Sequence, residues 1–154
     1  MKKLLTVLVS VAFLAMAAGA AMAADSNTVT VSASITGTCK FNSATSTLAF
    51  GALDPTLTSD ATVTGSTTFW CTKGASYTVS GNNGANASGV QKRMVHATLT
   101  EYIPYAMSFS PTSGTGAGKT TAVTLSLSGT IANADYINAS AGAYTDTVVL
   151  SITP

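Results

Sequence analysis

The chain has 154 residues, of which seven are Lys or Arg, six are Asp or Glu, and one is His. Without its first 23 residues it has 131, with five basic and six acidic side chains and a net charge of −1. Such sparse charge excludes a nucleic-acid-binding face, because that face needs clustered Lys and Arg. Ser and Thr supply 42 of these 131 residues. A chain so rich in Thr and so poor in helix formers is typical of an all-β protein.

The first 23 residues have the order of a secretory signal peptide. Lys2 and Lys3 precede an apolar run over residues 4–18, and small residues at 21–23 suit a cleavage site. The run is too short and too rich in Ala to prefer spanning a bilayer, although a retained membrane anchor is the alternative. We therefore predict a signal peptide over residues 1–23, no retained anchor, and an exported chain of one domain.

Two cysteines, Cys39 and Cys71, remain after the signal peptide. In an exported protein an even number of cysteines favours a disulfide, and two cysteines allow one intramolecular pairing. Closing a loop of about 33 residues contributes roughly 3–4 kcal/mol in the chain-entropy model. We predict this bond, with free buried thiols as the alternative.

The first segment after the signal peptide is the most regular strand pattern in the chain. Over residues 28–36 every second side chain is apolar, and the residues between them are Ser or Thr. In an extended strand the apolar set lies on one face. This set comprises Val29, Val31, Ala33 and Ile35. Gly37 then separates the segment from the rest of the chain, and no turn pairs it with a neighbour.

Alternating patterns recur along the rest of the chain, and none shows a helical stripe. They predict strands within residues 61–71, 77–79, 95–99, 103–109, 123–131 and 144–152, separated by loops rich in Gly, Ser and Asn. Short strands with turns between them favour an antiparallel sandwich of immunoglobulin-like size. In this pattern Cys71 points inward.

Residues 147–153, where the last predicted strand ends, lack the usual protection of a sheet edge. Exposed edges are normally blunted by charge or Pro, and this segment contains neither. An unprotected edge together with a spare N-terminal strand favours β-strand addition from another chain.

An enzyme is difficult to build from these residues. A metal site or a Ser-His-Asp triad would have to centre on His96, the single histidine, and no HxH, HExxH or GxSxG motif surrounds it. We expect no catalytic function, no metal and no cofactor.

Several short motifs resemble those of the spore coat U domain proteins, a family that includes the pilin subunits of archaic chaperone–usher pili. They follow the family's order over nearly the whole chain after the signal peptide, although the Trp-Gly pair that the family often shows after Tyr105 is missing. The matching pieces are Cys39-x-Phe41, Leu48-Ala49-Phe50-Gly51, Trp70-Cys71-Thr72-Lys73-Gly74, Tyr77-Thr78-Val79, Lys92-Arg93-Met94, Ile103-Pro104-Tyr105, Gly142-Ala143-Tyr144-Thr145-Asp146-Thr147-Val148 and the residues from there to Pro154.

The resemblance implies an incomplete immunoglobulin-like β-sandwich that a donor strand from another chain completes. Residues 24–36 are then the donor strand and residues 37–154 the pilin domain. Val148, Leu150 and Ile152 border the acceptor groove. The implied partners are a periplasmic chaperone, an outer-membrane usher and neighbouring copies of this or related pilins. The implied function is that of a structural subunit of a cell-surface pilus, exported through the periplasm, that supports adhesion and biofilm formation.

Two other functions remain open from the sequence. One is a non-polymerising secreted coat protein that uses residues 28–36 as a strand of its own sandwich. The other is a small carbohydrate-binding module in which Trp70 or Tyr136 stacks on a sugar.

Overall fold

The structure, a computed structural model, describes residues 24–154. The predicted signal peptide and its cleavage site therefore lie outside the described residues. The described chain divides into two units, residues 24–34 and residues 35–154, which we describe separately and call the N-terminal segment and the body.

The N-terminal segment and the four residues that follow it, 24–38, contain no helix and no strand. The four alternating apolar side chains predicted for a strand are all exposed, and Val31 is 89% and Ile35 86% accessible. The alternating pattern of these residues is therefore not accompanied by strand pairing in the structure. Residues 28–36, which the coat-protein alternative uses as a strand of the chain's own sandwich, form no strand in the structure.

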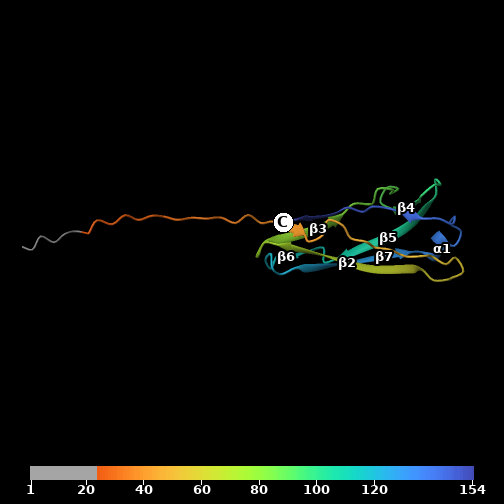
Figure 1. The fold of residues 1–154 in the computed structure, drawn as a ribbon, viewed down its shortest axis with the longest axis horizontal. Helices are drawn as coiled ribbons and strands as arrows, with labels where there is room; N and C mark the ends of the chain where they lie inside the picture. The colour runs from red at the N-terminus through yellow and green to blue at the C-terminus, as the bar shows by residue number, and fades with distance from the viewer. Residues whose placement is uncertain (1–23) are drawn as a thin grey trace, which may run out of the picture. The chain divides into compact units, whose positions relative to one another are not determined.

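The body is built from antiparallel strands in two sheets, as predicted (Figure 1). The six-stranded sheet has the order β1-β2-β7-β5-β4-β8, and the three-stranded sheet has the order β6-β3-β9. The bounds of the strands are β1 Cys39–Phe41, β2 Ala61–Cys71, β3 Ser76–Gly81, β4 Lys92–His96, β5 Tyr102–Ser110, β6 Ser113–Thr115, β7 Val123–Ile131, β8 Tyr144–Thr145 and β9 Leu150–Thr153. A four-residue helix, α1 Asn133–Tyr136, lies in a polar stretch where the sequence predicted no regular element.

The longest ladder joins β2 and β7, from the pair Ala61–Ile131 to the pair Phe69–Val123. Its alternation explains the burial, because every second side chain faces the other sheet. Phe69 and Cys71 of β2 and Leu125 and Leu127 of β7 are buried together with Tyr77 and Val79 of β3. Since β3 belongs to the second sheet, this cluster shows that the two sheets pack face to face.

The two ends of the body differ. At one end the disulfide joins β1 to the end of β2, and Gly37 lies against Ala75 and Pro154. We call it the disulfide end. At the other end the loop 54–60 is bound to α1, because Asn133 donates from its backbone nitrogen to Asp60 and from its side chain to the carbonyl of Leu57, each at 2.8 Å. We call it the helix end. Figure 1 shows α1 and the C-terminus at opposite ends of the body.

The last part of the chain differs from the single strand predicted over residues 147–153. Residues 144–145 form β8 at the edge of the six-stranded sheet, and residues 150–153 form β9 at the edge of the other. The residues between them pass from one sheet to the other, so they belong to neither ladder. The inward alternation nevertheless continues without a break, with Tyr144, Asp146, Val148, Leu150 and Ile152 half-buried and the residues between them exposed.

Candidate functional site: an open groove in the body

A cavity of about 840 Å³ opens between two segments that are far apart in the sequence. One wall comes from residues 46–53, which belong to no sheet, and the opposite wall from residues 139–148. Strands β4 and β5 form the floor. We call this cavity the open groove.

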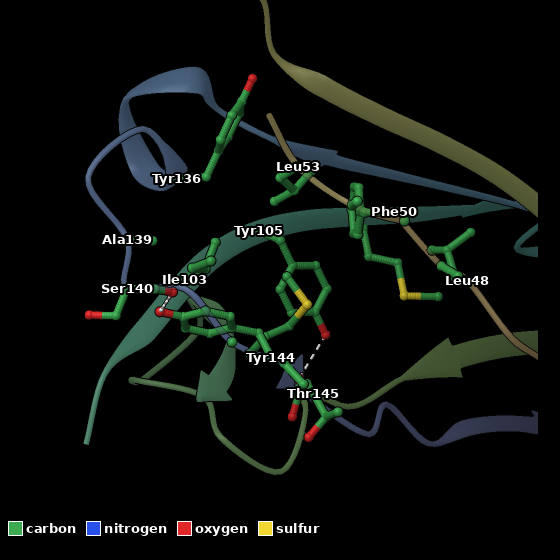
Figure 2. A pocket seen from close by; sticks show the side chains of 18 of the residues that line it. Leu48, Phe50, Leu53, Ile103, Tyr105, Tyr136, Ala139, Ser140, Tyr144 and Thr145 are labelled. Atoms are coloured by element: carbon green, nitrogen blue, oxygen red, sulfur yellow. Dashed lines mark hydrogen bonds between the residues drawn. The ribbon is translucent and has the colours of Figure 1, made fainter. Parts of the chain in front are cut away.

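The lining of the open groove is mostly apolar (Figure 2). The first wall presents Leu48, Phe50 and Leu53, which are half-buried and alternate with exposed residues at 49 and 51–52. The other lining residues include Met94, Ile103, Tyr105, Met107, Tyr144 and Val148. Several of these side chains pack on a second buried cluster, which contains Ile103, Tyr105, Ile131 and Tyr136. The groove therefore exposes one side of a hydrophobic core to solvent.

Strand β9 follows the second wall in the sequence and has one unpaired edge. Its register with β3 runs from the pair Gly81–Leu150 to the pair Thr78–Thr153, and no other described strand pairs with it. The carbonyls of Thr147 and Val149 accept hydrogen bonds from Ala85 and Asn82 on the β3 side, each at 3.0 Å. Main-chain groups alternate between the two edges of an extended strand, so those of Val148, Leu150 and Ile152 face the unpaired edge.

Of the three residues predicted to border an acceptor groove, one lines the open groove and two do not. Val148 lines the cavity, and Leu150 and Ile152 pack on the first buried cluster from the inward face of β9. Their role toward another chain stays a prediction. Leu48 and Phe50 of the other wall belong to one of the family motifs, and nothing in the sequence predicts that they line a groove.

One charged side chain, Asp146, holds the second wall to the rest of the body. Its carboxylate accepts a 2.7 Å hydrogen bond from the hydroxyl of Tyr105 and two bonds from Asn86, from the backbone nitrogen at 3.0 Å and the side-chain nitrogen at 3.1 Å. Burial acts to raise the pKa of Asp146, but these donors outweigh it and the pKa is lowered. Burial and the adjacent carboxylate raise the pKa of Tyr105, so its phenol stays protonated and continues to donate.

The loop before β8 is fixed by His96 and Glu101. The Nδ1 atom of His96 accepts from the backbone nitrogens of Thr98 and Leu99, each at 3.1 Å, and its Nε2 lies 3.3 Å from the carbonyl of Ala141. A carbonyl can only accept, so these contacts fit the tautomer with its proton on Nε2. Glu101 accepts from the backbone nitrogen of Ser140 at 3.0 Å, and hydrogen bonding from the side chain and the backbone of Ser140 lowers its pKa.

The remaining candidate sites are accounted for as follows. Cys39 and Cys71 form the predicted disulfide, and Cys71 is fully buried as its parity predicted. Trp70 is half-buried beneath Lys119, and the hydroxyl of buried Tyr136 donates to the carbonyl of Ser59 at 2.7 Å. Between residues 24 and 154 there is no group of three or more His, Cys, Asp or Glu placed to hold a metal ion. None of the helices in this range is long and apolar enough to cross a membrane.

The family model of the Spore Coat Protein U domain matches residues 25–151. The chain belongs to this family. The match includes both the N-terminal segment and nearly all of the body. Among curated proteins no sequence matches the chain.

Two solved structures are similar to this chain in fold. The first is the CsuC–CsuE chaperone–tip adhesion subunit pre-assembly complex from archaic chaperone-usher Csu pili of Acinetobacter baumannii, with 18% identity over 77% of this chain and 40% of the other, at a TM-score of 0.49. The second is a chaperone–tip adhesin complex described for CFA/I fimbriae biogenesis, with 13% identity over 77% and 41% and a TM-score of 0.43. The chain spans about two fifths of the length of these solved chains.

Proposed function

We propose that this protein is a structural subunit of a surface pilus, in which residues 24–36 of one copy complete the sandwich of the next. The observation that carries the proposal is the open groove, an apolar cavity beside the unpaired edge of β9, in a chain that also carries an exposed strand pattern. The groove lacks one strand, and the N-terminal segment has one to supply. Family membership supports the proposal, because the family includes pilus subunits.

The chemistry of the two surfaces is complementary. The donor presents Val29, Val31, Ala33 and Ile35 on one face, and the groove presents aliphatic, aromatic and Met side chains. Burying a large aliphatic side chain contributes about 1.5–3 kcal/mol as an upper bound, and each new ladder hydrogen bond about 0.5–1.5 kcal/mol net. Docking a strand therefore gives a tight junction, and a free subunit carries an aggregation-prone groove.

The partners and location follow from this proposal. A subunit with an unfilled groove needs a chaperone in the periplasm, then an outer-membrane usher that exchanges the chaperone for the next copy. We assign residues 1–23 to the signal peptide, residues 24–36 to the donor strand and residues 37–154 to the pilin domain. The assembled product lies on the cell surface and supports adhesion and biofilm formation. The role is structural and uses no cofactor.

Removing residues 24–36 tests the donor role directly. The truncated subunit retains the groove, so it is expected to accumulate as a complex with its chaperone and to give no filaments. The measurement compares filament yield with the yield of chaperone-bound subunit. Normal filaments would contradict the donor role, and loss of folding with chaperone present would favour a self-contained sandwich.

A matched pair of variants tests which face of the donor enters the groove. Val31→Asp places a charge on the apolar face, where docking would remove it from water, and is expected to abolish assembly. Ser32→Asp places the same charge on the hydrated face and is expected to be tolerated. Heat-resistant polymer on gels is the readout. Equal effects, or greater damage from Ser32→Asp, would show that the assigned face is wrong.

A further inference from the structure

The exposed charged side chains of the body are divided between its two ends, whereas Lys92, Arg93, Glu101 and Asp146 are half-buried. Three exposed acids, Asp54, Asp60 and Asp135, lie at the helix end, on α1 and the loop bound to it. Among the described residues these are half of the acidic side chains.

The exposed lysines Lys40, Lys73 and Lys119 lie toward the disulfide end, and they are three of the five basic side chains described. Lys119 lies over the ring of Trp70 at 5.9 Å, and Trp70 is the ladder partner of Lys40. Gly118 donates to the carbonyl of Cys71, which brings this loop to the disulfide.

The helix end also exposes two large apolar side chains. Leu57 is 53% and Ile137 37% accessible. Both flank Asn133, whose side chain binds the carbonyl of Leu57 and whose own carbonyl accepts from the backbone nitrogen of Ile137 at 3.2 Å. They are therefore held in place around α1, beside the three acids.

Chain connectivity determines which ends meet when a donor strand docks. Residues 24–36 lead into Gly37, which lies against Pro154, so the donor leaves its own body at the disulfide end. If the donor strand docks parallel to β9, the body that supplies it lies at the disulfide end of the acceptor. The two disulfide ends then face each other, and each copy can give its strand to the other. That arrangement closes as a dimer. If it docks antiparallel to β9, its disulfide end meets the acceptor's helix end, and the contact repeats without closing, as a filament requires.

We propose that the helix end of each body is a docking surface for the disulfide end of the next copy of this chain. The inference rests on the proposed function, and it adds a contact between bodies to the strand in the groove. The acids and lysines give the two ends opposite charge, and Leu57 and Ile137 supply an apolar centre. Two helix ends repel each other because both are acidic, and two disulfide ends repel because both are basic. This repulsion favours the repeating order over the closed dimer.

Charge exchange on filaments purified from cells tests this contact. Asp135→Lys alone and Lys73→Glu alone are each expected to lower the persistence length of the filaments at least about twofold at low salt. The double variant is expected to restore it. Wild-type filaments in about 0.5 M salt should resemble the single variants, because the Debye length then falls to a few ångströms. Thr64→Lys, at an exposed position in the middle of β2, is the control and should have no effect.

The outcomes separate this inference from the proposed function. Heat-resistant polymer on gels reports the strand in the groove and should be unchanged in every variant. Unchanged persistence length in both single variants, or a double variant no stiffer than they are, would overturn the contact between bodies while leaving the groove intact. Absence of heat-resistant polymer from the wild type would overturn both.

Discussion

The two halves of the sandwich are packed to different degrees. Around the disulfide, Phe69, Cys71 and Leu125 are fully buried between the two sheets, and we call this the packed half. Around the open groove, Ile131 and Ile103 are buried, but Phe50, Met94 and Val148 on their outer side stay half-buried. We call this the open half. The difference shows that the hydrophobic core is fully covered where two sheets of the same chain pack together. The core stays partly exposed where no strand lies between residues 46–53 and residues 144–149.

Truncation of a core side chain should have the largest effect in the packed half. Phe69 makes edge-to-face contacts with Phe41 and Tyr77, with ring centroids 5.9 and 5.0 Å apart. Phe69→Ala is expected to lower the free energy of unfolding by about 3–5 kcal/mol. Denaturant unfolding of the refolded full chain measures it.

Phe50→Ala is the matched change in the open half. Because Phe50 is only half-buried in the free chain, Phe50→Ala should lower the free energy of unfolding clearly less than Phe69→Ala does. It should also lower the heat resistance of the polymer, since Phe50 lines the open groove. A cost for Phe50→Ala equal to that of Phe69→Ala would show that the open half is as tightly packed as the other.

The disulfide should come next in size. Cys39 and Cys71 are 32 residues apart, and the chain-entropy model gives the bond about 3–4 kcal/mol. Reduction, or Cys71→Ser, is expected to shift the denaturant midpoint downward by the corresponding amount and to lower subunit yield. Mass spectrometry of the alkylated, non-reduced protein checks the bond. Two alkylated thiols in the folded chain would contradict it.

The hydrogen bonds of Asp146 should have an intermediate effect, confined to the open half. Tyr105→Phe removes the 2.7 Å bond to the carboxylate and is expected to cost about 1.5–3 kcal/mol. Asp146→Asn should have a similar cost. Hydrogen exchange at residues 144–149 should rise in both variants, whereas exchange in β2 and β7 should not.

Acid should reproduce the loss of these hydrogen bonds. The pKa of Asp146 is lowered in the folded chain, so its stabilisation is fully present above the unfolded pKa of about 3.9 and is lost as the pH falls through the folded value. The Tyr105→Phe variant should show a smaller loss of stability over the same range. An identical acid response in the two proteins would contradict this assignment.

A change at Gly84 should disturb the same carboxylate by a steric contact. Gly84 has a φ of +92°, which L side chains rarely adopt, and a Cβ there would meet the carboxylate of Asp146. Gly84→Ala is expected to displace Asp146 and to cost at least as much as Tyr105→Phe, because backbone strain of about 1 kcal/mol adds to the loss of hydrogen bonds at the carboxylate. Gly89→Ala is the control, since Gly89 also has a positive φ but open space around it. Equal costs would mean that strain alone, and not the contact, is responsible.

The alternation of apolar and polar residues predicted much of this fold from the sequence. The alternation over residues 61–71 and 123–131 predicted β2 and β7 and the inward position of Cys71, because the period of two is a local property of an extended chain. The cysteine count predicted the disulfide. The family motifs predicted a pilin-like sandwich that a donor strand completes, and the role of the N-terminal segment as that donor stays a prediction.

Only the tertiary structure decided how the open groove is built. Its walls come from residues 46–53 and 139–148, about 90 positions apart, and neither wall carries a local signal for the other. Asp146 finds its partners 41 and 60 residues away, at Tyr105 and Asn86, so no spacing in the sequence indicates them. The division of charge between the two ends has the same origin, because sheet topology gathers scattered acids at α1 and scattered lysines at the disulfide. A sequence records which side chains alternate, whereas the order of the strands decides which of them meet.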